Sequence, residues 1–321
     1  MIRRRVPAVG SNPAAFDLQG HRGARGLAPE NTLPAFARAL SIGVTTLEMD
    51  AGLTADGVVV IAHDRRLDPD IARGPDGKWL TGRTPAIREL SLRALQRFDV
   101  GRLRPGSDYA RRFPHQRRHD EVSIPTLAEV FALVRRARNA QVRFNIETKI
   151  APDAPADTAD PRTFTRALIE VIGNHGMAAR TTIQSFDWRS LAIVRSEASE
   201  IATSCLSSQQ PAFDTIGADR HADSPWTAGI RYRDHGSVPK MVKAAGGKIW
   251  SPDHRDVSEA LVRQARSLGL VVLPWTVNDR VDVERLIDWG VDGLITDYPN
   301  RLREILAARG LPLPRATPVK P

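Results

Sequence analysis

Residues 46–63 read TLEMDAGLTADGVVVIAH, and the dipeptide Asp56-Gly57 separates two apolar runs within this stretch. An Asp-Gly pair between apolar runs is typical of a tight β-hairpin turn. Because side chains alternate along a strand, Glu48 and Asp50 point to the same face of the first run. We therefore predict a strand over 46–54 that carries two carboxylates and folds back through a second strand over 58–63.

Strand-like segments recur along the rest of the chain, and most are separated by segments with the apolar spacing of amphipathic helices. The predicted strands are residues 16–20, 46–54, 142–148, 182–185, 201–206, 248–251, 270–275 and 293–296. The predicted helices are residues 32–42, 127–138, 163–174, 188–196, 238–245, 258–268, 281–289 and 299–308, of which 238–245 has the weakest pattern.

Eight strands with alternating helices predict an α/β fold, a closed TIM (β/α)₈ barrel, and 321 residues suit that fold. The alternative is a doubly wound open sheet, which is disfavoured because the HRGARG segment at 21–26 lacks the G-x-G-x-x-G glycine spacing. We expect the barrel to span 16–310, with an insertion at about 64–123 after its second strand and a short helix near 90–96. Residues 1–15 are expected to be a flexible N-terminal segment, and 311–321 a Pro-rich extended or disordered tail.

Composition excludes several classes of protein. The formal charge is +9, but the arginines are spread along the chain without interleaved aromatics, which argues against nucleic-acid binding and fits an anionic small substrate. The single cysteine, Cys205, excludes an intrachain disulfide and a zinc ribbon. No apolar run approaches the roughly 18 to 20 residues of a membrane span, so we expect a soluble protein without an integral membrane segment. Its compartment stays open between cytoplasmic and, if a leader has been lost, periplasmic or secreted.

Acidic side chains gather where predicted strands end. Glu147 and Lys149 share a face at the end of the third strand, as Glu48 and Asp50 do in the second. Three carboxylates converging at the mouth of a barrel would repel one another by several kcal/mol unless a cation lies among them. Oxygen ligands favour one hard ion, Mg²⁺ or Ca²⁺. The alternative is that Glu48 and Asp50 pair with arginines outside the barrel.

Two histidines flank these carboxylates. His21 follows the first predicted strand and His63 ends the strand that returns from the hairpin, so together they can supply a general acid and a general base for phosphodiester cleavage. Arg22 and Lys149 would hold phosphate oxygens. Trp275 is either a core residue or a packing surface for the substrate's carbon skeleton. The remaining histidines are interpreted as ordinary surface or core residues: His115, His119, His175, His221, His235 and His254.

Several spaced blocks of the sequence, in order, resemble the glycerophosphodiester phosphodiesterase family. The early blocks are His21-Arg22-Gly23, Pro29-Glu30-Asn31-Thr32, Glu48-x-Asp50, Thr54-x-Asp56-Gly57 and His63-Asp64. The later ones are Ile124-Pro125-Thr126-Leu127-x-Glu129-Val130, Glu147-Thr148-Lys149, Trp275-Thr276-Val277-Asn278 and the run from Gly293 to Pro299. The resemblance implies a TIM barrel with a small insertion after the second strand, and a divalent cation. By position it implies metal ligands at Glu48, Asp50 and Glu147, general acid and base at His21 and His63, and phosphate contacts at Arg22 and Lys149.

The resemblance also implies the activity: a hydrolase of glycerophosphodiester and lipid metabolism that releases glycerol 3-phosphate and an alcohol. Attack by the substrate's own glycerol hydroxyl and direct attack by water stay open, as do the headgroup preference and the oligomeric state. The alternatives are a lysophospholipase D acting on lyso-lipids and a non-catalytic barrel that binds phosphorylated ligands. Capping of the following helix by Asn31 or Thr32 makes the Pro29–Thr32 block mainly architectural in this interpretation. An unusually arginine-rich insertion leaves room for a more anionic or bulkier substrate.

Overall fold

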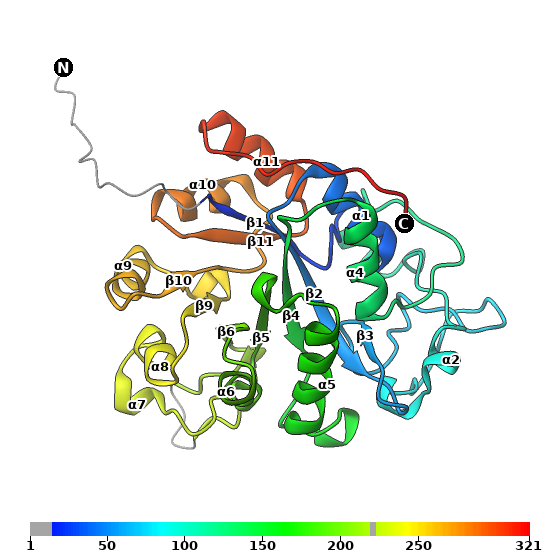
Figure 1. The fold of residues 1–321 in the computed structure, drawn as a ribbon, viewed down its shortest axis with the longest axis horizontal. Coiled ribbons are helices and arrows are strands. Elements are labelled where there is room, and N and C mark those ends of the chain that lie inside the picture. The colour runs from blue at the N-terminus through cyan, green and yellow to red at the C-terminus, as the bar shows by residue number, and fades with distance from the viewer. Residues whose placement is uncertain (1–14, 219–222) are drawn as a thin grey trace.

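A computed structural model describes residues 15–218 and 223–321 of the chain. The expectation for residues 1–14 and the interpretation of His221 lie outside the described residues. Eight parallel strands form one sheet in the order β10-β9-β6-β5-β4-β2-β1-β11 (Figure 1). These strands are β1 (Asp17–Gly20), β2 (Thr46–Leu53), β4 (Arg143–Thr148), β5 (Thr181–Ser185), β6 (Ala202–Ser207), β9 (Ile249–Pro252), β10 (Val271–Val272) and β11 (Gly293–Thr296).

The two ends of this sheet meet. The backbone N–H of Asp292 donates to the carbonyl of Val272 at 3.0 Å, and the N–H of Ile295 donates to the carbonyl of Pro274 at 3.0 Å, distances typical of a β-ladder. These bonds join the edge that carries β10 to the edge that carries β11. The predicted (β/α)₈ barrel is therefore confirmed, in a nearly closed form.

Helices surround the strands because each presents one apolar face to the sheet (Figure 1). The long helices are α1 (Leu33–Ile42), α4 (Leu127–Arg136), α5 (Pro161–Asn174), α6 (Trp188–Glu197), α8 (Val238–Ala244), α9 (Glu259–Ser267), α10 (Arg280–Asp288) and α11 (Pro299–Ala308). Each of the eight predicted helices has a counterpart here. Short helices are α2 (Leu92–Leu95), α3 (Asp108–Arg112) and α7 (Tyr232–His235).

The hairpin predicted at Asp56-Gly57 is present. β2 pairs with the antiparallel strand β3 (Val59–Ile61), and Gly57 takes a φ of 78°, which a side chain would disfavour. Every residue of β2 is buried, as expected of a parallel strand covered on both faces. A buried strand of this kind fixes the direction of the carboxylates that it carries.

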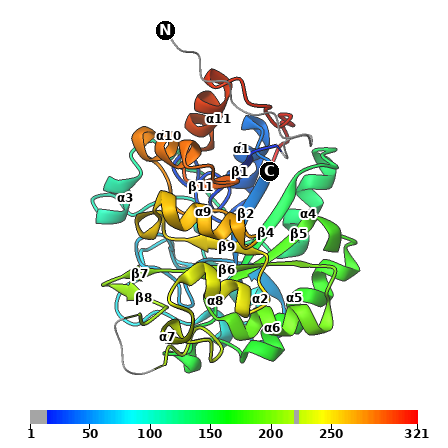
Figure 2. The same cartoon turned by 90° about the vertical axis from the view of Figure 1, so that its left-hand side faces the viewer.

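The segment between β3 and α4 packs on the barrel around an apolar cluster of its own, which includes Leu67, Ile87 and Leu95. The stretch just after its helix α3 contacts the loop that follows β1: the Gln116 side chain donates to the Arg25 carbonyl at 2.8 Å, and the Arg117 N–H donates to the Leu27 carbonyl at 3.0 Å. Figure 2 shows α3 and the small hairpin of β7 (Gln209–Gln210) and β8 (Phe213–Asp214) on the same side of the molecule. Chain segments far apart in sequence thus surround one mouth of the barrel.

Residues 311–321 form neither helix nor strand and run in an extended course over the barrel helices. The Thr317 N–H donates to the Leu40 carbonyl at 2.8 Å, and Arg303 donates to the Pro314 carbonyl at 2.7 Å. Leu311 and Val319 pack against the main core. Among the described residues, no helix has the length and apolar character needed to cross a membrane.

Candidate active site

Three carboxylates converge at the carboxyl ends of β2 and β4. The strand register places Asp50 beside Glu147, and Glu48 lies two residues earlier on the same face of β2. One oxygen from each of Glu48, Asp50 and Glu147 lies within 4.8 Å of the others, and all three residues are buried. The alternative in which Glu48 and Asp50 pair with arginines outside the barrel is wrong, because both face inward.

The electrostatics of this cluster fit a bound cation. Burial and the neighbouring Asp50 raise the pKa of Glu48 well above its usual value. Burial also raises the pKa of Glu147 to about 7, although Lys149 opposes this shift. Burial would raise the pKa of Asp50 as well, but Arg22 and the nearby histidines hold it below its usual range. Two of three carboxylates therefore resist ionisation without a positive partner, and the all-oxygen donor set suits a hard divalent ion.

His21 lies directly after β1 and faces the cluster. Its Nδ1 lies 2.6 Å from Asp297 Oδ1, and its Nε2 lies 3.9 Å from Glu48 Oε2. A carboxylate only accepts hydrogen bonds, so the proton of neutral His21 is assigned to Nδ1 and the lone pair to Nε2. Burial, followed by the charge of Arg25, lowers the pKa of His21 to about 4. The ring is therefore neutral near pH 7.

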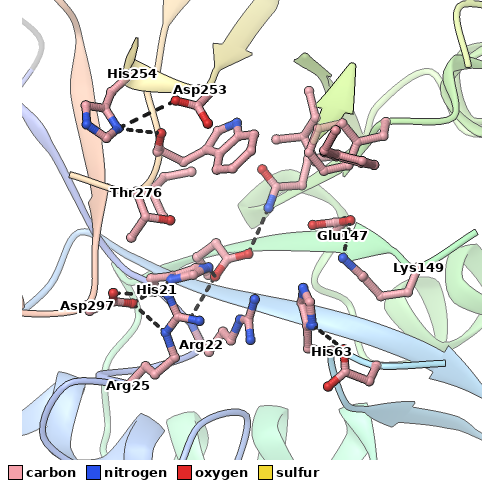
Figure 3. A pocket seen from close by; sticks show the side chains of 18 of the residues that line it. His21, Arg22, Arg25, His63, Glu147, Lys149, Asp253, His254, Thr276 and Asp297 are labelled. Carbon is pink, nitrogen blue, oxygen red and sulfur yellow. Dashed lines mark hydrogen bonds and ion pairs between the residues drawn. The ribbon is translucent and has the colours of Figure 1, made fainter. Parts of the chain in front are cut away.

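His63 lies across the pocket from His21, two residues beyond the end of β3 (Figure 3). Its Nδ1 lies 2.8 Å from Asp64 Oδ1, which orients the ring as Asp297 orients His21. Burial, followed by the charge of Arg22, lowers its pKa. The pocket thus holds two neutral imidazoles, each backed by a carboxylate, as expected for groups that exchange protons.

Arg22 and Lys149 lie among the carboxylates. Arg22 Nε is 3.2 Å from Asp50 Oδ2, and its Nη1 donates to Glu30 Oε1 at 2.5 Å. Lys149 Nζ donates to Glu147 Oε1 at 2.7 Å and lies 3.8 Å from Asp50 Oδ1. These cations offset part of the cluster's negative charge.

Asp297 is a site residue that the sequence analysis did not select. Besides its contact with His21, it accepts hydrogen bonds from Arg25 Nε at 2.8 Å and from Asn278 Nδ2 at 2.7 Å. It follows β11 directly, so the strand-end rule that selected His21 would also have selected Asp297. The same is true of Gln184 near the end of β5, whose Nε2 donates to Glu48 Oε1 at 2.9 Å.

The interpretation of the Pro29–Thr32 block as mainly architectural needs correction. Thr32 does cap α1, because its hydroxyl accepts from the Ala35 N–H. Asn31, however, donates from Nδ2 to Asp50 Oδ2 at 2.8 Å and takes a φ of 55°. Glu30 is also part of the site through its bond to Arg22. No local pattern reveals these contacts, because the partner of Asn31 lies nineteen residues away.

Aromatic residues line the other side of the pocket. Phe186 packs with Trp275 at 5.5 Å between ring centroids and with Phe213 at 4.9 Å, both in edge-to-face geometry. Trp226 and Leu206 complete this aromatic wall. Trp275 is half-buried, and its Nε1 donates to the Ser251 carbonyl at 2.9 Å. It therefore packs in a small core and lines the pocket at the same time.

The whole pocket has a volume of about 700 Å³ (Figure 3). All the predicted site residues except Asp50 line it, and Asp50 lies just beneath them in contact with Arg22, Asn31 and Lys149. His254, interpreted as an ordinary residue, also lies at its rim. The pocket lining does not include the other described histidines, His115, His119, His175 and His235.

Comparison with known proteins assigns the chain to a family. The model of the glycerophosphoryl diester phosphodiesterase family matches residues 21–301. The chain belongs to this family. The predicted resemblance is therefore confirmed, and so is the expectation that the chain is an enzyme, a phosphoric diester hydrolase.

Individual members of the family support the assignment over most of the chain. A glycerophosphodiester phosphodiesterase of Bacillus subtilis is 29% identical over 288 residues, which cover 89% of this chain and 84% of that protein. The crystal structure of a Silicibacter pomeroyi protein assigned as a glycerophosphoryl diester phosphodiesterase superposes with a TM-score of 0.83 at 37% identity, covering 94% of this chain and 96% of that one. A phosphodiesterase of Oleispira antarctica, solved with the product sn-glycerol-3-phosphate, shares the fold at a TM-score of 0.64 and 22% identity, covering 90% and 96%.

Proposed function

We propose that this member of the family hydrolyses glycerophosphodiesters to glycerol 3-phosphate and an alcohol, with one divalent cation, Mg²⁺ or Ca²⁺. Glu48, Asp50 and Glu147 would hold the cation, which would neutralise charge on the phosphoryl oxygens. The observation that carries the proposal is the convergence of these three buried carboxylates with two neutral imidazoles in one pocket. The product bound by the Oleispira antarctica structure is consistent with this substrate class.

The two histidines divide the proton transfers. One neutral imidazole accepts a proton from the attacking water or glycerol hydroxyl, and the other, which first takes up a proton from the solvent, donates that proton to the leaving alcohol. The carboxylates of Asp297 and Asp64 keep the Nδ1 protons in place, so both Nε2 atoms are available for this exchange. Arg22 and Lys149 bind the phosphate oxygens, since both are charged, buried and already anchored to the carboxylate cluster.

Purified protein tests this proposal when it is incubated with glycerophosphocholine and Mg²⁺ or Ca²⁺ and assayed for glycerol 3-phosphate. We expect that EDTA abolishes turnover and that Mg²⁺ and Ca²⁺ restore it to different degrees. His21→Ala and His63→Ala should each reduce kcat by a factor of about 100 to 10,000, the usual contribution of a general acid or base. The matched control is His119→Ala, an exposed histidine away from the pocket, which should retain kcat. Full turnover in either catalytic variant would refute the histidine roles.

A second candidate is hydrolysis of lyso-lipids, the reaction of a lysophospholipase D. The aromatic wall favours it, because Phe213 leaves 40% of its surface exposed and could receive part of an acyl chain. Comparing kcat/KM for a lyso-lipid and for its deacylated form separates the two candidates. A large preference for the lyso-lipid would favour the second.

A further inference from the structure

The pocket has five arginines in its lining, and they differ in their partners. Four face a carboxylate, in the pairs Arg22–Glu30, Arg25–Asp297, Arg65–Asp153 and Arg255–Asp253, although the third pair is long at 3.9 Å. Within the described ranges, Arg112 is the one pocket arginine with no carboxylate partner. Its guanidinium also donates no hydrogen bond to a described residue. The charged guanidinium of Arg112 is thus available to bind a group in the pocket.

Arg112 is nevertheless held in place. Its guanidinium carbon lies 5.3 Å from the ring centroid of Tyr109 and 5.7 Å from that of Phe113. The two rings are themselves in contact, with centroids 5.2 Å apart. Stacking on aromatic faces restricts an arginine while leaving its N–H donors free, and this lowers the entropy lost when a ligand binds.

The two rings are anchored to the site. The Tyr109 hydroxyl donates to Glu30, the same carboxylate that receives Arg22. Phe113 is buried beneath Arg25, whose guanidinium carbon lies 4.7 Å from its ring centroid. α3, which begins at Asp108, is therefore tied through Glu30 to Arg22, and Phe113 just after it contacts Arg25, the partner of Asp297. Arg112 is itself exposed, but the rings on which it stacks are fixed to residues of the site.

The other arginines of the insertion cannot take over the position of Arg112 in the pocket. Neighbouring Arg111 pairs with Asp108, and Arg102 pairs with Asp120. The lining of the pocket includes neither of these two nor Arg104, Arg117 and Arg118. Of the insertion's arginines, Arg65 and Arg112 line the pocket, and Arg65 faces Asp153, so Arg112 is the one without a carboxylate partner among the described residues.

We infer that Arg112 binds a second anionic group, a carboxylate, on the alcohol half of the phosphodiester. This inference rests on the proposed function, in which Arg22, Lys149 and the cation already serve the phosphate that is cleaved. An unpaired guanidinium in a partly enclosed pocket attracts a negative group and binds it through charge-assisted hydrogen bonds. The pocket has a volume of about 700 Å³, which leaves space for an alcohol that carries an anionic group beside the glycerol phosphate half of the substrate.

Two substrates that differ by one carboxylate test the inference: glycerophosphoserine and glycerophosphoethanolamine. Arg112→Gln should lower kcat/KM for glycerophosphoserine about tenfold, mainly through KM, because it removes one charge-assisted contact at a site that solvent partly screens. The value for glycerophosphoethanolamine should change less than twofold, so the ratio between the substrates should fall about tenfold. Arg112→Lys should give an intermediate ratio, since it keeps the charge and loses the fork.

Arg111→Gln is the matched control, and its ratio should equal that of the unmodified enzyme. An equal loss for both substrates in Arg112→Gln would overturn the inference, because Arg112 would then act on the common phosphate or on folding. An unchanged ratio would overturn it as well. If the unmodified enzyme hydrolysed neither substrate with Mg²⁺ or Ca²⁺, the proposed function would fail first, and this inference would fail with it.

Discussion

Asp297 shows how one carboxylate organises several groups of the site. It contacts the ring of His21, the guanidinium of Arg25 and the amide of Asn278, and it is itself almost fully buried. Burial alone would raise its pKa, but Arg25 and His21 hold it below its usual range. The negative charge therefore persists at neutral pH. It keeps the His21 proton on Nδ1 and compensates a buried arginine.

Asp297→Asn should lower kcat about 100-fold or more while leaving KM nearly unchanged. An amide can also donate to Nδ1, so the tautomer that presents the Nε2 lone pair is no longer enforced. Arg25 also loses its charge partner, so the thermal midpoint should fall. Steady-state kinetics and thermal unfolding measure the two effects. Asp288→Asn, which breaks an exposed pair with Arg309, is the control and should retain kcat. A kcat within threefold of the unmodified enzyme would contradict the positioning role.

At the scale of elements, strand ends explain what the sequence could predict about the site. Glu147 lies late in β4 and His21 just beyond β1, whereas Glu48 and Asp50 lie in the part of β2 that pairs with β4, and the barrel brings these positions together. Alternation along the strand then assigns the face. The fold and the carboxylate cluster can therefore be predicted from two local rules, the position of a residue along a parallel strand and the alternation of side chains.

The rest of the site depends on contacts between distant loops, which no local rule supplies. The aromatic wall takes Phe186, Phe213 and Trp226 from the loop after β5, from strand β8 and from a later loop, and only packing brings them together. The predicted strand 270–275 is a regular strand only over Val271–Val272, although its bonds to β9 continue: the Leu273 N–H donates to the Trp250 carbonyl and the Trp275 N–H to the Pro252 carbonyl, each at 3.0 Å. The same stretch still closes the barrel through its carbonyl groups.

The insertion has its own polar centre at Asp99. This carboxylate accepts hydrogen bonds from the N–H groups of Gly101 at 2.8 Å and Val122 at 3.3 Å, and it pairs with Arg73. Burial would raise its pKa, but these partners hold it below its usual value. Asp99 therefore joins the beginning, middle and end of the segment that carries α3.

Asp99→Asn should lower stability at pH 7 by about 1–3 kcal/mol, the usual effect of weakening a charged hydrogen-bond acceptor. Since the folded pKa is depressed, the contribution of Asp99 is fully present above the unfolded pKa of about 3.8 and is lost as the pH falls through the lower folded value. The difference between the two proteins should therefore shrink below pH 4. Urea unfolding at pH 7, 5 and 3.5 measures it, with Asp76→Asn, at an exposed turn of the same insertion, as control. A difference that grows on acidification would contradict this assignment.

Over the whole molecule, the two ends of the barrel have different tasks. The carboxyl ends of the strands hold the pocket, and the insertion and the β7–β8 hairpin flank it. At the other end, the chain over 311–321 contacts the end of α1 through Leu40 and residues just after α4 through Asn139. A barrel permits this separation because its core lies between the two ends, so stability and chemistry can be altered independently.

Deleting residues 311–321 tests this separation. The deletion removes the bonds of Thr317 to Leu40 and Asn139 and exposes the core surface that Leu311 and Val319 cover. At about 0.5–1.5 kcal/mol per hydrogen bond and about 25 cal/mol per Å² of apolar surface, the cost is several kcal/mol. The thermal midpoint should therefore fall by several degrees, whereas kcat and KM at 25 °C should stay within twofold, because no residue of this segment lines the pocket. Thr317→Val, which keeps the chain and removes one hydroxyl, should give a smaller decrease of the midpoint. A deletion that lowered kcat at an unchanged midpoint would show instead that the two ends are coupled.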